Sequence, residues 1–243
     1  MKIIGIIPAR YASSRFPGKP LVDLKGKTMI QRVYEGAIKS NYLEKVIVAT
    51  DDKRIFDAVK EFGGNAVMTS ENHTTGTDRC GEVIQLFPDA DVAINIQGDE
   101  PLVDYRQLDQ LCEAFKDKSV QIATLGIKAV SEEDKSNPNR IKIVLDKDEN
   151  AMYFSRSPIP NTVNSKRELV ESFPFYRHIG LYAFRTQVLS EIIQLKPTQL
   201  EQVESLEQLR WLYYGYKIKV IPTDIETPNI DVPADLEKVL NAL

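Results

Sequence analysis

Two arginines, a lysine and two serines lie together in a short stretch that follows an apolar run at the start of the chain. The stretch reads IIPARYASSRFPGKPL, residues 6–21, and these polar members are Arg10, Ser13, Ser14, Arg15 and Lys19. Guanidinium and ammonium groups are suited to bind phosphate oxygens. Because the glycine and the prolines impose a shape that a merely solvated basic loop does not need, we expect this stretch to be a phosphate-binding loop.

The loop departs from the two common glycine motifs of nucleotide-binding proteins. Gly18-Lys19 resembles the end of GxxxxGK[ST], but Ser13 stands at the first glycine and Pro20 at the metal-binding hydroxyl. The dinucleotide motif GxGxxG does not occur in the sequence. The prediction therefore depends on the charges and on the shape of the loop.

Acidic residues follow two further apolar runs. Thr50, Asp51 and Asp52 follow residues 45–49, and Asp99 lies in QGDEP, which follows residues 92–96. A lone carboxylate next to a buried strand is costly unless it is paired or bound to a metal. Mg²⁺ prefers one or two carboxylates together with substrate phosphates, so Asp99 is a candidate magnesium ligand.

Alternating strand and helix patterns must position these residues. Short β-branched runs predict buried strands at 2–7, 45–49 and 92–96, and helical apolar stripes run through 29–38, 55–62, 80–87 and 108–115. This alternation predicts a mostly parallel α/β sheet that is covered on both sides. Ligands of such sheets bind outside the carboxyl ends of the strands, where the basic loop and the acids would lie.

The pattern changes after about residue 120. Residues 155–175 are polar and dotted with prolines, so we expect an inserted ribbon or flap there. Strands are predicted at 121–127, 140–145, 151–154, 178–184 and 217–221, one helix at about 200–213, and a final helix with Leu236, Val239, Leu240 and Leu243 on one face. We treat the chain as one domain with an appendage.

The composition excludes some classes of protein. The chain has 243 residues, is 42% hydrophobic and 27% charged, and carries a formal net charge of −4, which argues against a general nucleic-acid binder. Cys80 and Cys112 fall on apolar stripes and are expected to be buried thiols. Ile3–Ile7 is too short for a signal-peptide core or a membrane span, so we expect a cytoplasmic protein without membrane insertion.

The opening stretch resembles, nearly residue for residue, the start of bacterial 3-deoxy-manno-octulosonate (Kdo) cytidylyltransferases. The resemblance continues in the family's order through VATDD, GTDR, NIQGDEP, NPNRIKIV, YFSRSPIP, RHIGLYAFR, LEQLRWLYYG and IDVPADLE. It implies an enzyme that transfers CMP from CTP to the anomeric hydroxyl of Kdo and releases pyrophosphate, for lipopolysaccharide synthesis. It also implies a Rossmann-like fold similar to A-type glycosyltransferases, with a CTP-binding core at 1–120, a sugar-binding and dimerisation appendage at 121–200 and a return to the core at 201–243.

The resemblance also implies roles for individual residues around CTP. Arg10, Lys19 and Asp99 would be catalytic, and Asp99 and Asp231 would bind Mg²⁺. CTP would contact Pro8, Ala9, Arg10, Ser13, Arg15, Lys19, Gly76, Thr77 and Asp78. From the residues alone, Asp231 could instead be the N-cap of the last helix, and Thr77 or Asp78 the N-cap of the helix that carries Cys80. We assign no general base, because a Mg²⁺ ion can lower the pKa of an oxygen that it binds.

An acidic sugar needs cations, and the resemblance assigns Arg79 and Arg156 to its carboxylate. Contacts to its hydroxyls would come from Gln97, His178, Tyr182, Glu207 and Gln208. Read alone, His178 could be structural, and Glu207 could belong to a solvated acidic helix face. The resemblance further implies a homodimer that packs through the flap.

Three other functions remain to be weighed against this one. The acceptor could be another acidic sugar, such as an amino analogue of Kdo or sialic acid. A catalytically silent nucleotide-binding module is disfavoured, because Lys19, Asp99 and Asp231 are all present. A metal-dependent sugar transferase is disfavoured as well, because Asp99-Glu100 is not a DxD motif.

Overall fold

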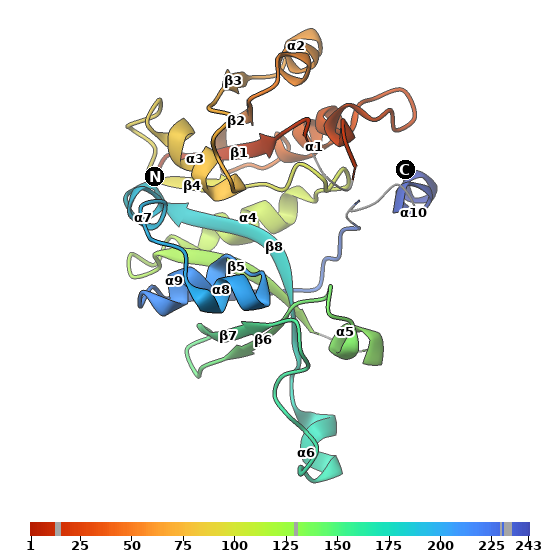
Figure 1. Cartoon of the computed structure of the whole chain (residues 1–243), viewed down its shortest axis with the longest axis vertical. Helices are drawn as coiled ribbons and strands as arrows, with labels where there is room; N and C mark the ends of the chain where they lie inside the picture. Colours follow the sequence, from red (N-terminus) through yellow and green to blue (C-terminus); the bar gives the residue numbers. More distant parts are fainter. Residues whose placement is uncertain (13–15, 129–130, 229, 231–234) are drawn as a thin grey trace.

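The central element of the fold is a single mixed β-sheet. The structure, a computed structural model, describes residues 1–243 except 13–15, 129–130, 229 and 231–234. Within these residues nine strands form the sheet, with the order β3-β2-β1-β4-β8-β5-β9 and with β6 and β7 as a side branch. Figure 1 shows helices on both sides of the sheet. The predicted α/β class is confirmed.

The first half of the sheet is parallel. β1 (Ile3–Ala9) pairs with β2 (Leu43–Thr50) on one side and with β4 (Val92–Asn95) on the other, and β3 (Ala66–Met68) continues beyond β2. The three strands predicted in this half are confirmed. β3 was not predicted, because three residues are too few to show a period of two.

Helices bury both faces of β1. Ile3 and Ile7 pack in one apolar cluster with α1 (Met29–Ala37), α2 (Lys53–Glu61) and α4 (Tyr105–Ala114). Ile4 and Ile6 pack on the other face with α3 (Gly76–Ile84), α7 (Thr186–Ile192) and α9 (Gln208–Tyr213). Burial on both faces explains why the strand reads as a continuous apolar run.

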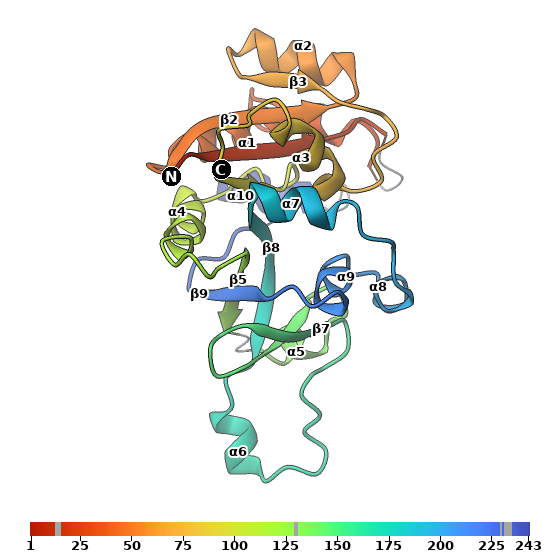
Figure 2. The same ribbon diagram turned by 90° about the vertical axis from the view of Figure 1, so that its left-hand side faces the viewer.

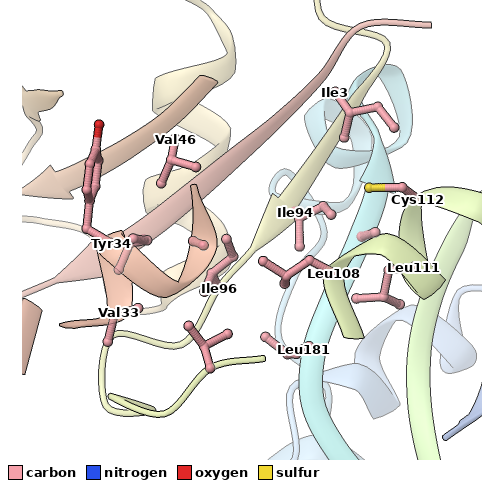
Figure 3. Packing of buried hydrophobic residues seen from close by; sticks show 14 of the residues in the cluster. Ile3, Val33, Tyr34, Val46, Ile94, Ile96, Leu108, Leu111, Cys112 and Leu181 are labelled. Carbon is pink, nitrogen blue, oxygen red and sulfur yellow. The ribbon is translucent and has the colours of Figure 1, made fainter. Parts of the chain in front are cut away.

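Both cysteines are free, buried thiols, as predicted. Figure 3 shows Cys112 in the first cluster, together with Leu108 and Leu111 of α4 and Ile94 of β4. Cys80 belongs to the cluster on the opposite face.

The second half of the sheet mixes strand directions. β8 (Tyr176–Arg185) runs antiparallel between β4 and β5 (Ile122–Lys128), and β9 (Ile218–Thr223) is parallel to β5. β6 (Lys142–Leu145) and β7 (Ala151–Ser155) form an antiparallel ribbon that branches from β8.

The segment predicted as a ribbon or flap at 155–175 is a helical excursion. It carries α6 (Arg167–Ser172), of which no residue is buried, and it projects away from the sheet in Figures 1 and 2. The ribbon itself is β6–β7, which comes before this segment. The excursion fits the expected flap, and the residues of the ribbon come earlier in the chain.

The single helix expected at about 200–213 is two helices, α8 (Gln199–Glu204) and α9. Ser205 between them has a left-handed backbone with φ 52°, which ends α8 and turns the chain. An apolar stripe alone could not reveal this break, because the stripe continues through it.

Shorter elements complete the chain. They are the 3₁₀ turn η1 (Lys19–Leu21), α5 (Glu132–Ser136) and α10 (Leu236–Ala242). Ile230 and Val239 pack with Leu24 and Met29 in a third apolar cluster, which holds the end of the chain against its first helix. Among the described residues, no helix is both long and apolar enough to cross a bilayer.

Candidate active site

A cleft of about 210 Å³ opens outside the carboxyl ends of β1 and β4. The chain leaves β1 toward β2 on one side, whereas it leaves β4 toward β5 on the other, which is the usual position of a ligand site in such sheets. The lining residues are Pro8, Ala9, Arg10, Lys19, Pro20, His73, Thr75, Gly76, Arg79, Gln97, Gly98 and Asp99. Eight of these twelve were predicted as site residues from the sequence.

The basic loop places Lys19 in this cleft. Gly18 has φ 73° and donates its backbone N–H to the carbonyl of Tyr11 at 2.9 Å, which closes the loop. Lys19 then begins η1, and Pro20 is suited to its first turn. The Lys19 Nζ donates to Asp99 Oδ2 and to the carbonyl of Ile230, both at 2.8 Å.

Tyr11 is held from two sides. The Arg54 guanidinium lies 3.3 Å from the centre of its ring, and Arg54 is itself paired with the Asp52 carboxylate at 2.6 Å. On the other side, a Cβ on Gly18 would lie 3.1 Å from the Tyr11 ring. The shape of the loop thus depends on a glycine at position 18.

Asp99 reaches the cleft because the chain after β4 passes close to β1. A Cβ on Gly98 would lie 2.8 Å from the carbonyl oxygen of Pro8, so only glycine fits. The Asp99 carbonyl accepts from the N–H of Ile230 at 3.0 Å, which brings the carboxyl-terminal segment to the same place.

The neighbouring acid has a different environment. Glu100 is buried, and its burial together with the nearby Asp99 raises its pKa to about 8. Thr227 donates its hydroxyl to this side chain at 3.4 Å. A group that is protonated near neutral pH is a poor cation ligand, so Asp99 is the better metal candidate of the two.

The donor set fits a magnesium ion. The carboxylate of Asp99 is a hard oxygen ligand at the edge of the cleft and is already paired with a cation, the Lys19 ammonium. Among the described residues, no group of three His, Cys, Asp or Glu side chains could hold a metal by itself. A site of this kind, with few protein oxygens, suits Mg²⁺ that is shared with phosphates.

Three sequence-predicted residues lie outside the described residues: Ser13, Arg15 and Asp231. The residue before Asp231, Ile230, lies at Asp99, as described above. The N-cap residue of α10 is Asp235. This replaces our alternative expectation that the N-cap would be Asp231.

The CTP-binding residues predicted at Gly76, Thr77 and Asp78 form the start of α3, and Gly76 lines the cleft. The N-cap is Thr75, whereas we expected Thr77 or Asp78. The Thr75 hydroxyl accepts from the N–H of Asp78 at 3.0 Å, and the Asp78 carboxylate accepts from the N–H of Thr75 at 3.1 Å. This reciprocal capping box has a sequence signal, T-x-x-D, which identifies Thr75 as the N-cap.

Arg79 lies at the cleft but is almost fully buried. Its guanidinium pairs with the Asp51 carboxylate at 2.8 Å and also donates to the Thr69 hydroxyl. Its charge is therefore already neutralised by a protein carboxylate. We expected Arg79 to approach the sugar carboxylate, and the sequence did not indicate this competing partner.

Arg156 has a different set of partners. Its guanidinium donates to three backbone carbonyls, those of Glu204 at 2.8 Å, Pro138 at 3.0 Å and Ser205 at 3.2 Å. Carbonyls orient a guanidinium without cancelling its charge. Arg156 is thus held in place with an available positive charge, as the binding of an anion requires.

The remaining residues predicted to contact the acceptor lie after β4, along β8 and at the start of α9. Gln97 donates to the carbonyl of Gly180 at 3.0 Å. The ring of Tyr182 is 5.1 Å from that of His178. Glu207 accepts from the Thr77 hydroxyl at 2.9 Å, burial raises the pKa of Glu207, and Gln208 beside it is buried. The structure thus joins the predicted nucleotide segment at α3 to the predicted sugar segment at α9.

Sequence reasoning missed His73, which lines the cleft and pairs with Glu82 of α3. A lone histidine in a polar loop gave no signal for this position. Gly98 was missed too, although a glycine directly before a candidate metal ligand is a usable sign of close backbone approach.

Comparisons with known proteins show the family of the chain. A family model described as Cytidylyltransferase matches residues 4–218. The 3-deoxy-manno-octulosonate cytidylyltransferase of Parabacteroides distasonis is 56% identical, with 99% of this chain and 97% of that protein covered. The protein of the same name from Bacteroides thetaiotaomicron is 53% identical, with 98% and 96% covered.

A solved structure is also similar over its whole length. It is that of CMP:2-keto-3-deoxy-manno-octonic acid synthetase complexed with CTP, with 43% identity and a TM-score of 0.93. The match covers 100% of this chain and 98% of that one.

Proposed function

The chain belongs to the 3-deoxy-manno-octulosonate cytidylyltransferase family, and on this premise we propose how its cleft performs the reaction. The enzyme transfers CMP from CTP to Kdo and releases pyrophosphate. We infer that Lys19 and Arg10 bind the triphosphate and that Asp99 binds its Mg²⁺. The observation that carries this assignment is the Lys19 ammonium, held 2.8 Å from Asp99 in a cleft at the sheet's switch point.

The bond changes define what the cleft must stabilise. The anomeric oxygen of Kdo forms a bond to the α-phosphorus of CTP and loses its proton, while the bond from that phosphorus to the bridging oxygen breaks and pyrophosphate leaves. Negative charge grows on the α-phosphoryl oxygens and on the leaving group. A positioned ammonium at Lys19 and a guanidinium at Arg10 stabilise that charge without having to reorganise.

Magnesium completes the proposed site. When bound, Mg²⁺ supplies charge neutralisation and orientation of the phosphates. Asp99 would hold it, and Asp231, known here only from the sequence, is the proposed second ligand. Lys19 would then exchange its contact with the Asp99 carboxylate for a phosphate oxygen, while the Ile230 carbonyl still orients it.

For the acceptor, we propose that Arg156 binds the sugar carboxylate and that His178, Tyr182, Gln97, Glu207 and Gln208 surround the hydroxyls. The three carbonyl contacts that orient Arg156 support this role. Arg79, already paired with Asp51, would contribute mainly by holding the wall of the cleft.

We also propose that the enzyme works as a homodimer in the cytoplasm, where CTP is available. The excursion around α6 exposes apolar side chains that a second copy could cover: Val163 is 84%, Leu169 63% and Phe173 42% exposed. Sedimentation of Leu169→Glu tests this contact, with Val203→Glu as the control on α8, because Val203 is also 84% exposed. Loss of a dimer in the first variant alone supports the proposal, and a wild-type monomer contradicts it.

The function is tested by pyrophosphate release from CTP with Kdo, its amino analogue or sialic acid. We expect turnover with Kdo that stops when EDTA removes the metal and returns with Mg²⁺. Release with another acid but none with Kdo would overturn the acceptor. Turnover that persists in EDTA would overturn the metal assignment. An Asp99→Asn variant should retain its fold and require more Mg²⁺, whereas Asp104→Asn, at the N-cap of α4, should not change the Mg²⁺ requirement.

A further inference from the structure

The pairing of β5 with β8 contains a bulge beside the proposed acceptor site. Thr124 lies opposite Tyr182, but the next residue, Leu125, lies opposite Ile179. Two residues of β8, Gly180 and Leu181, are therefore left without a partner in the register of β5. Bulges of this kind redirect the side chains next to them and are common near active sites.

The buried hydroxyl of Thr124 lies at this bulge. Its Oγ1 lies 2.7 Å from the Leu181 carbonyl, 3.2 Å from the Ile179 carbonyl and 2.9 Å from Nε2 of His178. A threonine hydroxyl has one hydrogen, and a carbonyl can only accept. The Leu181 carbonyl is the nearest of the three, and a hydroxyl that donates its hydrogen there is left to accept from His178, which implies a proton on Nε2 of His178.

The His178 ring is uncharged near neutral pH. Burial, with a smaller effect of the adjacent Arg177, lowers the pKa of His178 to about 3, so the ring is neutral near pH 7. A neutral imidazole has one proton, and with Nε2 protonated, Nδ1 has a free lone pair. The ring is held in place by Phe154 and Tyr182, whose ring centres lie 5.3 and 5.1 Å from it.

We propose that Thr124 is a positioning residue that fixes His178 in the Nε2–H tautomer and so presents Nδ1 as a hydrogen-bond acceptor to a hydroxyl of the sugar. This inference rests on the proposed function, in which His178 contacts the acceptor. Gln97 lines the cleft and donates to the carbonyl of Gly180 in the bulge. This hydrogen bond connects the bulge to the cleft in which we propose that CTP binds. An acceptor nitrogen at this position selects a substrate group that can donate, as a hydroxyl does.

The tautomer can be read directly by ¹⁵N NMR of the imidazoles in the ligand-free, full-length enzyme. The chain has two histidines, so a His73→Gln variant assigns both rings. We expect a protonated Nε2 and an unprotonated Nδ1 for His178 in the wild type. Thr124→Ser, which keeps the hydroxyl, should give the same pattern, and Thr124→Val should shift it toward the Nδ1–H form.

The matched control is Thr186→Val. The Thr186 hydroxyl also donates to a backbone carbonyl at 2.7 Å, that of Ala90, but Thr186 follows the last residue of β8, whereas His178 lies near the start of that strand. The Thr186→Val variant should change neither the tautomer nor the kinetics. In Thr124→Val we expect the KM for Kdo to rise about fivefold, as the loss of one hydrogen bond predicts, while the KM for CTP stays within about twofold.

A wild-type ring protonated on Nδ1, or a Thr124→Val spectrum identical to wild type, would overturn the proposal. So would an unchanged KM for Kdo in a variant whose tautomer has shifted. Should Thr124→Val fail to fold, the wild-type and Thr124→Ser spectra still decide the tautomer. Because the spectra need no substrate, a lack of turnover with Kdo would contradict the proposed function without changing this result.

Discussion

Lys19 and Asp99 are 80 positions apart in the sequence, yet the Lys19 ammonium lies 2.8 Å from the Asp99 carboxylate. The loop after β1 and the loop after β4 thus meet over one ion pair. The Ile230 carbonyl contacts the same ammonium, so three distant parts of the chain fix a single cation where the triphosphate charge is proposed to lie.

The Lys19→Ala variant should remain folded and lose at least about 10³-fold in kcat, since one positioned charge on a transferring phosphoryl group has an effect of this size. Pyrophosphate release measures the loss, and circular dichroism confirms the fold. Lys27→Ala is the control, because Lys27 forms a comparable ion pair with Glu35 on the surface. Wild-type turnover in folded Lys19→Ala would remove the assigned role.

The Gly18→Ala variant should raise the KM for CTP about tenfold, because the added Cβ would press on the Tyr11 ring and move Lys19. Gly26→Ala is a close match: Gly26 has φ 80° against 73° for Gly18, but nothing lies within 4 Å of its Cβ position. An alanine is strained at either position, because both glycines have a positive φ. A difference in KM for CTP between the two variants therefore reports the contact with the Tyr11 ring. Equal KM values for the two variants would contradict a shaping role for Tyr11.

The Arg79→Met variant should lower the free energy of unfolding by about 3 kcal/mol, because it leaves the Asp51 carboxylate without its buried partner. Adding Asp51→Asn should recover part of the loss, since the unpaired charge is then absent. Urea unfolding measures both variants, and Arg106→Met, at an exposed ion pair with Asp104, should have little effect. A double variant less stable than Arg79→Met would argue against the ion pair as the cause.

The stability of the protein should depend on pH through His178. The pKa of this ring is about 3 in the folded protein and about 6.5 when unfolded, so below pH 6.5 the unfolded chain takes up a proton that the folded chain does not. Above pH 6.5 the protonation of His178 does not lower the free energy of unfolding. Below pH 6.5 that free energy falls by about 1.4 kcal/mol for each pH unit. Between pH 6.5 and 5, wild type should lose about 2 kcal/mol more than His178→Gln in urea unfolding. Parallel pH profiles for the two proteins would show that His178 is not held neutral.

The strands and the cleft could be predicted because their signals are local. The apolar runs at 2–7, 45–49 and 92–96 became adjacent parallel strands, and the polar residues after them met at one edge. The position of β8 between β4 and β5 could not be predicted, because pairing partners leave no trace in a period-two pattern.

Within the site, residue types were easier to predict than their partners. The sequence indicated Arg79 and Arg156 as equivalent cations, whereas the structure distinguishes them by a carboxylate at one and backbone carbonyls at the other. Such differences arise from tertiary contacts between β2 and α3 or between β7 and α8, which single-sequence patterns do not encode.

The contact between Lys19 and the Ile230 carbonyl places part of the proposed triphosphate site beyond the last strand of the sheet. Because β9 ends at Thr223, all nine described strands can pair without position 230. Assembly of the sheet alone would therefore leave the ammonium without one of its two oxygen contacts.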